Sequence, residues 1–120
     1  MSVKEGTLIA EAREFLDEIC GSGVPLQPLM RTGRFPDGWP TRYLGFVERV
    51  STSYGQSLPL PREIMAVLYA VSVYCTKRYL DWQRITGESD DALEQVVNQV
   101  RWAADQFVLS RYWKRAHSKE

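Results

Sequence analysis

Apolar residues recur along this chain with the period of an α-helix, in four segments that are separated by turn-forming residues. The pattern predicts helices over about residues 7–20, 41–54, 61–86 and 90–116. In the first segment an apolar stripe lies opposite a face rich in acids, as in a helix that covers a core. That stripe consists of Leu8, Ala12, Phe15 and Ile19. Glycines at 21, 55 and 87 suit the ends of the first three helices.

Residues 21–40 have no clear period, and no stretch of the chain shows the alternation that predicts a strand. We therefore expect an all-α fold, a four-helix bundle with a long irregular loop between helices 1 and 2. At 120 residues the chain has the size of one domain. We expect a single helical domain over residues 1–120.

The third predicted helix is apolar nearly all round in its first half. Its main stripe consists of Ile64, Leu68, Val71, Cys75 and Trp82. Further apolar residues off that stripe are Met65, Tyr69, Val73 and Leu80. A helix that is apolar on most sides is typical of a buried position, so we expect this helix to be the central one.

The fourth predicted helix carries two apolar stripes. The core stripe consists of Leu93, Val97, Val100, Ala104 and Phe107. On an ideal helix Leu109 and Trp113 each lie within about 20° of Trp102, on the side away from the core stripe. Such a second stripe is either covered by the long loop or binds a partner, and tryptophan is a favoured anchor of interfaces. Both interpretations are open at this point.

The long loop ends in the stretch "RTGRFPDGWPTRY", residues 31–43. A Pro-Asp-Gly turn brings Phe35 and Trp39 together, and three arginines surround them: Arg31, Arg34 and Arg42. One hypothesis is a clamp, because guanidinium groups bind carboxylate or phosphate and aromatic rings offer stacking faces. The other is a strap, in which the rings plug the core and the arginines pair with acids of helix 1. Large aromatic side chains bury strongly, which favours the strap.

Charge is balanced overall but unevenly distributed. The net charge is zero, so the chain as a whole has no electrostatic bias toward nucleic acid or an anionic membrane. Residues 61–87 sum to +2, residues 88–110 to −4 and residues 111–120 to +3. The basic tail and the arginine-rich loop give an alternative, a nucleic-acid-binding helical protein. Cations are also favoured at helix C-termini without any ligand.

Candidate catalytic groups are few. The single histidine is His117, close to the end of the chain, and the two cysteines, Cys20 and Cys75, are far apart. We expect reduced thiols, no cofactor and no metal site. A catalytic alternative is a Mg-dependent helical hydrolase that uses the carboxylates of helix 1: Glu11, Glu14 and Glu18. A solvated acidic face explains these residues more simply.

The sequence thus favours a function carried by the surface. We expect a non-enzymatic protein-protein interaction module of bacterial type, such as an inhibitor, an immunity or adaptor protein, or a small assembly subunit. Its partner is another protein or a second copy of the chain. The first candidate surface is Trp102, Leu109 and Trp113, and the second is Arg31, Arg34, Phe35, Trp39 and Arg42. The longest apolar stretch has 12 residues, too few to span a bilayer, and we expect a soluble cytoplasmic protein without a signal peptide.

Overall fold

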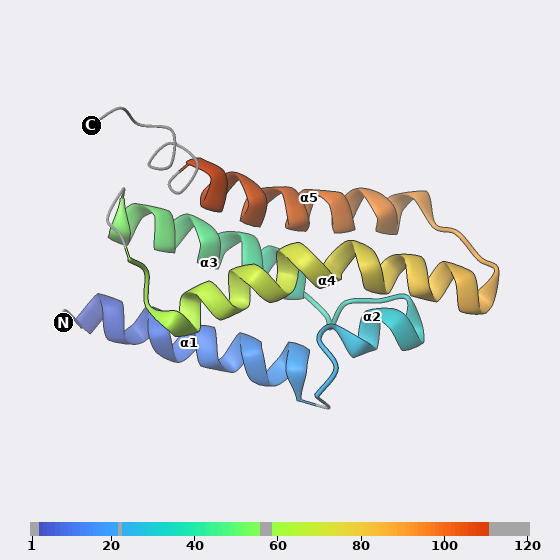
Figure 1. The fold of residues 1–120 in the computed structure, drawn as a ribbon, viewed down its shortest axis with the longest axis horizontal. Helices are drawn as coiled ribbons and strands as arrows, with labels where there is room; N and C mark the ends of the chain where they lie inside the picture. The colour runs from blue at the N-terminus through green and yellow to red at the C-terminus, as the bar shows by residue number, and fades with distance from the viewer. Residues whose placement is uncertain (1–2, 22, 56–58, 111–120) are drawn as a thin grey trace.

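The structure is a computed structural model that describes residues 3–21, 23–55 and 59–110. These residues form five α-helices and no strand, which confirms the all-α prediction (Figure 1). The helices are α1 (Val3–Cys20), α2 (Gln27–Thr32), α3 (Trp39–Tyr54), α4 (Arg62–Thr86) and α5 (Asp91–Val108).

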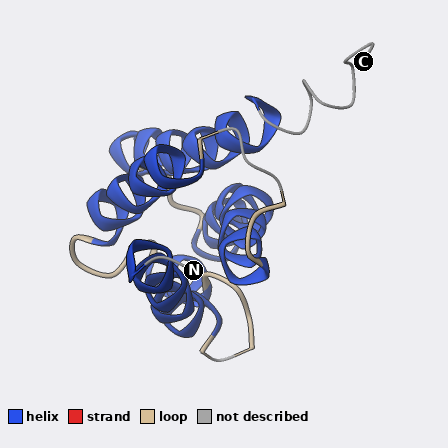
Figure 2. Cartoon of the chain, turned by 90° about the vertical axis from the view of Figure 1, so that its left-hand side faces the viewer, coloured by secondary structure: helices blue, strands red, loops and turns tan. Residues whose placement is uncertain are grey.

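Four long helices enclose the interior, and consecutive helices are not always neighbours. Helix α1 packs against α3 and α4, and α5 packs against the same two helices. Helices α3 and α4 lie diagonally opposite each other, although they follow one another in sequence. In Figure 1, α1 and α4 run left to right, whereas α3 and α5 run right to left. Figure 2 shows the same helices grouped around a shared interior from the left-hand end.

The segment 21–40, expected as a long irregular loop, contains α2 and the first residues of α3. A proline occupies the first turn of α2, and Gly33 ends the helix at φ 69°, with its amide donating to the Leu29 carbonyl at 3.0 Å. Helix α2 packs on α4 and α1. With 6 residues it is shorter than two turns, too short for an apolar period to reveal it.

Helix starts differ from the sequence prediction, most of all in α1, which begins at Val3 rather than at about residue 7. Helix α3 begins at Trp39 rather than at about residue 41, because Pro40 fits the first turn of a helix. Helix α5 begins at Asp91 and is capped by Asp90, whose carboxylate accepts from the Leu93 amide at 3.0 Å. Its predicted continuation over residues 111–116 lies outside the described residues.

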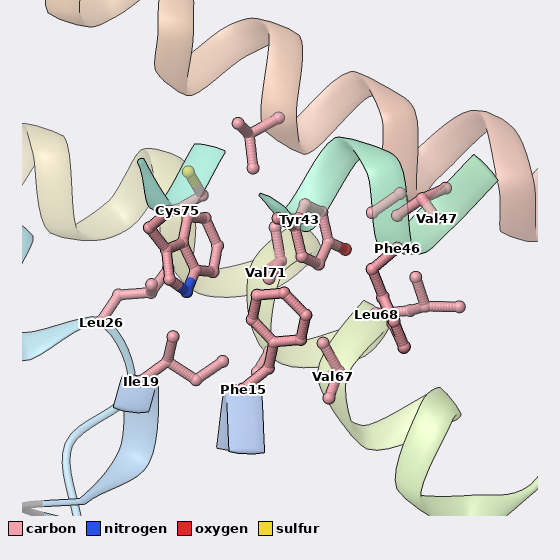
Figure 3. Packing of buried hydrophobic residues seen from close by; sticks show 14 of the residues in the cluster. Phe15, Ile19, Leu26, Tyr43, Phe46, Val47, Val67, Leu68, Val71 and Cys75 are labelled. Carbon is pink, nitrogen blue, oxygen red and sulfur yellow. The ribbon is translucent and has the colours of Figure 1, made fainter. Parts of the chain in front are cut away.

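The buried apolar residues form one cluster to which every helix contributes. The predicted stripe of α1 is buried as expected, each residue being at most 2% exposed. On α5 four residues of the predicted stripe are buried, Val97, Val100, Ala104 and Phe107, whereas Leu93 is partly buried against the core. In the centre Phe15 of α1 lies beside Tyr43 of α3, with their ring centroids 5.8 Å apart, and Val71 of α4 lies close by (Figure 3).

Helix α4 holds a central position, as predicted, but part of its apolar surface is exposed. Helix α4 does pack against three others, α1, α2 and α5. Its apolar residues Tyr69, Val73 and Leu80 are nevertheless 61%, 42% and 54% exposed. Neighbouring helices reach the main stripe of α4 but leave this outer side open. Among the described residues no helix combines the length and the apolar content that a membrane span requires.

Candidate functional site

Trp39, one of the predicted contact residues, belongs to the core. Its side chain is 0% exposed. The indole stacks between Phe35 and Tyr43, with ring centroids 5.1 Å away on either side, and meets Phe15 edge-on at 5.8 Å. This packing is what the strap hypothesis expects of Trp39. It corrects the assignment of Trp39 to an exposed contact surface, because a fully buried ring is not presented to a partner.

Arg42 is likewise occupied within the chain. Its guanidinium forms an ion pair with Glu18 of α1 at 2.6 Å and lies over the Phe15 ring, 5.1 Å from the centroid. The hydrogen bond to Glu18 raises the pKa of Arg42 above its ordinary value. Arg42 therefore ties α3 to α1, as the strap hypothesis predicts for the arginines of this stretch.

The helix 1 carboxylates are engaged in the same way. Glu11 pairs with Arg49 of α3 at 2.6 Å, which repeats the Glu18–Arg42 pair two turns away. Within the described ranges no three His, Cys, Asp or Glu side chains are grouped so that they could hold a metal ion. Glu11 and Glu18 thus act as ion-pair partners for α3, and Glu14 is exposed between them.

The rest of the arginine-rich stretch borders an open groove of about 900 Å³. Arg34 and Phe35 line it on one side, opposite the start of α5, and Trp82 and Leu93 lie among its other walls. Three carboxylates also line the groove: Asp37, Glu88 and Asp90. Arg31 is exposed but is not among the lining residues. The residues of the predicted second surface therefore differ in access: Arg31 and Arg34 are exposed and Phe35 is partly buried, whereas Arg42 is exposed but paired with Glu18.

The tryptophan of the predicted first surface is bare. Trp102 is 62% exposed and Leu109 is 48% exposed. The hypothesis that Phe35 and Trp39 cover this stripe is wrong for Trp102, because Trp39 packs between α1 and α3 and Phe35 stacks on it. The third predicted residue, Trp113, lies outside the described residues.

Sequence reasoning missed that α4 continues this apolar surface. Tyr69 and Leu109 line one groove of about 340 Å³ along the α4–α5 contact, and the Ser72 hydroxyl donates to Asp105 beneath it. Val73 and Leu80 follow Tyr69 along the same side of α4, within about 40° on an ideal helix. We call the five exposed residues the α4–α5 strip: Tyr69, Val73, Leu80, Trp102 and Leu109. The signal in the sequence was the set of apolar residues off the main stripe of α4.

The cysteines lack the features of reactive thiolates. Burial raises the pKa of the Cys75 thiol to about 12, and burial also raises the pKa of Cys20. Both thiols are free, and the Cys75 Sγ donates to the Val97 carbonyl at 3.7 Å. A high pKa keeps a thiol protonated at neutral pH and a poor nucleophile. His117, the remaining candidate, lies outside the described residues.

Two surfaces are therefore candidate binding sites, the α4–α5 strip and the open groove beside Arg34. The strip has the larger exposed apolar side chains, and the groove has the mixed charges. Comparisons with protein-family models, with curated proteins and with solved structures each give no match to this chain.

Proposed function

We propose that this chain is a non-enzymatic protein-protein interaction module that binds its partner through the α4–α5 strip. Its scaffold is a cytoplasmic four-helix bundle in one domain, with α2 folded into the connection between α1 and α3. The carrying observation is that Trp102, at 62% exposure, belongs to a set of exposed apolar residues on two helices that pack against each other. Contiguous exposed apolar surface of this kind is typical of protein interfaces.

The α4–α5 strip has the features of a protein-binding site. Trp102 projects from α5 as a large apolar anchor, the residue type that dominates binding energy when it enters a partner. The groove between Tyr69 and Leu109 provides a receptor for a partner side chain. Asp105 and Ser72 supply a polar group at its floor, which gives such a contact orientation as well as area.

The accessible part of the arginine-rich stretch supports nucleic-acid binding less well. Arg42, one of the three arginines of this stretch, is bound to Glu18. The groove next to Arg34 is lined by three carboxylates, which repel a phosphate backbone. Arg31 and Arg34 fit better as polar contacts at the edge of a protein interface.

The decisive experiment places a photo-crosslinking amino acid at position 102 and identifies the proteins captured in the native host. We expect a defined adduct from position 102 and none from position 17, an exposed polar site on α1. The paired substitutions Trp102→Gln and Leu109→Gln should abolish association while leaving the helical content unchanged. A matched control is Ile85→Gln, because Ile85 is 66% exposed but lies off the strip on α4. Capture that is equal at positions 102 and 17 contradicts the proposal.

A further inference from the structure

The two helices that carry the strip have opposite charge. Residues 61–87 sum to +2, whereas residues 88–110 sum to −4. On α4 the positive charge is concentrated near the C-terminal end, where Lys77, Arg78 and Arg84 share the single carboxylate of Asp81. Three cations around one acid leave an excess of positive charge there. The side chain of Arg84 is 77% exposed, so this charge reaches solvent.

The negative charge of α5 lies near its N-terminal end. Asp91 and Glu94 are exposed in its first turn, and Glu88 is exposed just before it. On an ideal helix Asp91 and Trp102 differ by 11 positions and lie within about 20° of each other, so Asp91 extends the strip along α5. On α4 Arg84 follows Leu80 by one turn and extends the strip in the same way.

The register of the two antiparallel helices brings these charged ends to the same level. The Tyr79 hydroxyl of α4 donates to the Asp90 carbonyl at the start of α5, at 3.1 Å. At the other end Ser72 of α4 meets Asp105 of α5. One face therefore has an apolar centre, with a cationic α4 end and an anionic α5 end side by side.

From this arrangement we infer that the partner of the strip is a second copy of this chain, in a two-fold dimer. In this dimer the two-fold axis runs parallel to α4 and α5, so each residue keeps its position along the helix direction. Helix α4 of each copy then packs against α5 of the other. Arg84 then faces the second copy's Asp91, and Trp102 rests on the second copy's Val73. The contact is self-complementary in charge and in apolar surface, as a two-fold interface requires. This inference rests on the proposed function, because it names the partner of the same strip.

The proposed pairing of Arg84 with the second copy's Asp91 is tested by reversing the charge of each residue in a separate variant. Arg84→Glu and Asp91→Lys should each weaken the homodimer about tenfold or more, since every interface then contains two repulsive contacts. An equimolar mixture of the two variants should associate with nearly wild-type affinity. In the mixed dimer the acid introduced at position 84 of one variant faces the base introduced at position 91 of the other. Asp81 retains Arg78 and Lys77 in the first variant, so the fold should survive, as circular dichroism will report. A mixture no tighter than either variant alone overturns the α4-to-α5 pairing.

The apolar centre is tested by sedimentation velocity from micromolar to millimolar protein. The wild type should show a reversible monomer–dimer equilibrium, and Trp102→Gln should raise the dissociation constant about a hundredfold. Ile85→Gln should leave it unchanged. A wild type that stays monomeric over the whole range overturns the inference.

Crosslinking at position 102 separates the two proposals. Adducts between copies of the chain support both. Adducts only with a different protein, together with a monomeric wild type, overturn the dimer and leave the interaction module standing. The absence of any specific adduct at position 102 overturns both.

Discussion

Trp39 and Trp102 are the same residue type on helices of similar length, and the fold treats them in opposite ways. Trp39 is 0% exposed and touches three other aromatic rings, whereas Trp102 is 62% exposed. The difference is whether another part of the chain covers the ring: α1 and the turn at Phe35 enclose Trp39, and Trp102 faces away from the core stripe of α5. A large aromatic therefore serves stability in one place and is left available for binding in the other.

Charged residues also differ between the α4–α5 strip and the enclosed side of the molecule, where α1 packs against α3 and α4. On the enclosed side Glu11, Glu18 and Arg13 of α1 each pair with a residue of another helix. Around the strip the ion pairs of the cluster at Asp81 and the Arg101–Asp105 pair each run within one helix. Charges on the enclosed side join helices to one another, while beside the strip the exposed Lys77 and Arg84 pair with Asp81 of their own helix.

The largest expected effect is the loss of stability on truncation of Trp39, compared with the same truncation of Trp102. Trp39→Ala should lower the free energy of unfolding by about 3–5 kcal/mol, because it removes a buried ring and leaves a cavity among Phe15, Phe35 and Tyr43. Trp102→Ala should change it by no more than about 0.5 kcal/mol in dilute solution. Urea denaturation followed by circular dichroism measures both. Equal losses would remove the contrast between the two residues.

A smaller loss should follow from adding one methyl group where α2 ends. Gly33 has φ 69° and lies against the Trp82 indole, with which an added Cβ would collide. Gly33→Ala should lower the free energy of unfolding by about 3 kcal/mol, from the left-handed backbone and the overpacking together. Gly38→Ala is the matched control, because Gly38 has φ 71° but open space around it, so it should cost only about 1–2 kcal/mol. Thermal and urea unfolding of the two variants report the difference, and identical losses would show that the Trp82 contact does not matter.

The ion pair between α3 and α1 should contribute less. Arg42→Ala removes the bond to Glu18 and the contact with Phe15, and we expect a loss of about 0.5–1 kcal/mol because both side chains are partly exposed. A double-mutant cycle with Glu18→Ala isolates the coupling between the two side chains. Salt should weaken that coupling, and a coupling of zero would assign the whole effect of Arg42 to its packing on Phe15.

The smallest effect is a pH dependence at the contact between α1 and α4. The pKa of Glu63 lies below its usual 4.5, first because of its own backbone hydrogen bond and then because of the hydrogen bond from Arg13. A depressed folded-state pKa means that the stabilisation is present above pH 4.5 and is lost as the pH falls through the folded-state pKa. Glu63→Gln should therefore lose less stability than the wild type on acidification. Arg13→Gln should lie between the two, and superimposable pH profiles for all three proteins would contradict this role.

Much of the local structure was readable from the sequence. The core stripe of α1 is buried as predicted, and so is that of α5 except for the partly buried Leu93. Helix α4 ends at Gly87 because a glycine adopts φ 72° without strain. What escaped the pattern was short or non-local. Helix α2 has too few residues to show a period, and the outer face of α4 is apolar in sequence without being covered in space. Exposure of Tyr69 and Val73 depends on where the other helices lie, which periodicity does not encode.

The sequence by itself determined that the chain is helical, where most helices end and which stripe of each helix faces the core, because these follow from local backbone preferences and from spacing along one helix. Only the tertiary structure decided which apolar surface is left uncovered. Trp39 is buried because α1, some 24 positions earlier in the chain, places Phe15 against it. Trp102 is bare because no described helix crosses the outer face of α4 and α5. Covering a side chain requires contact with residues distant in sequence, and so the arrangement of the helices separates the core from the candidate interface.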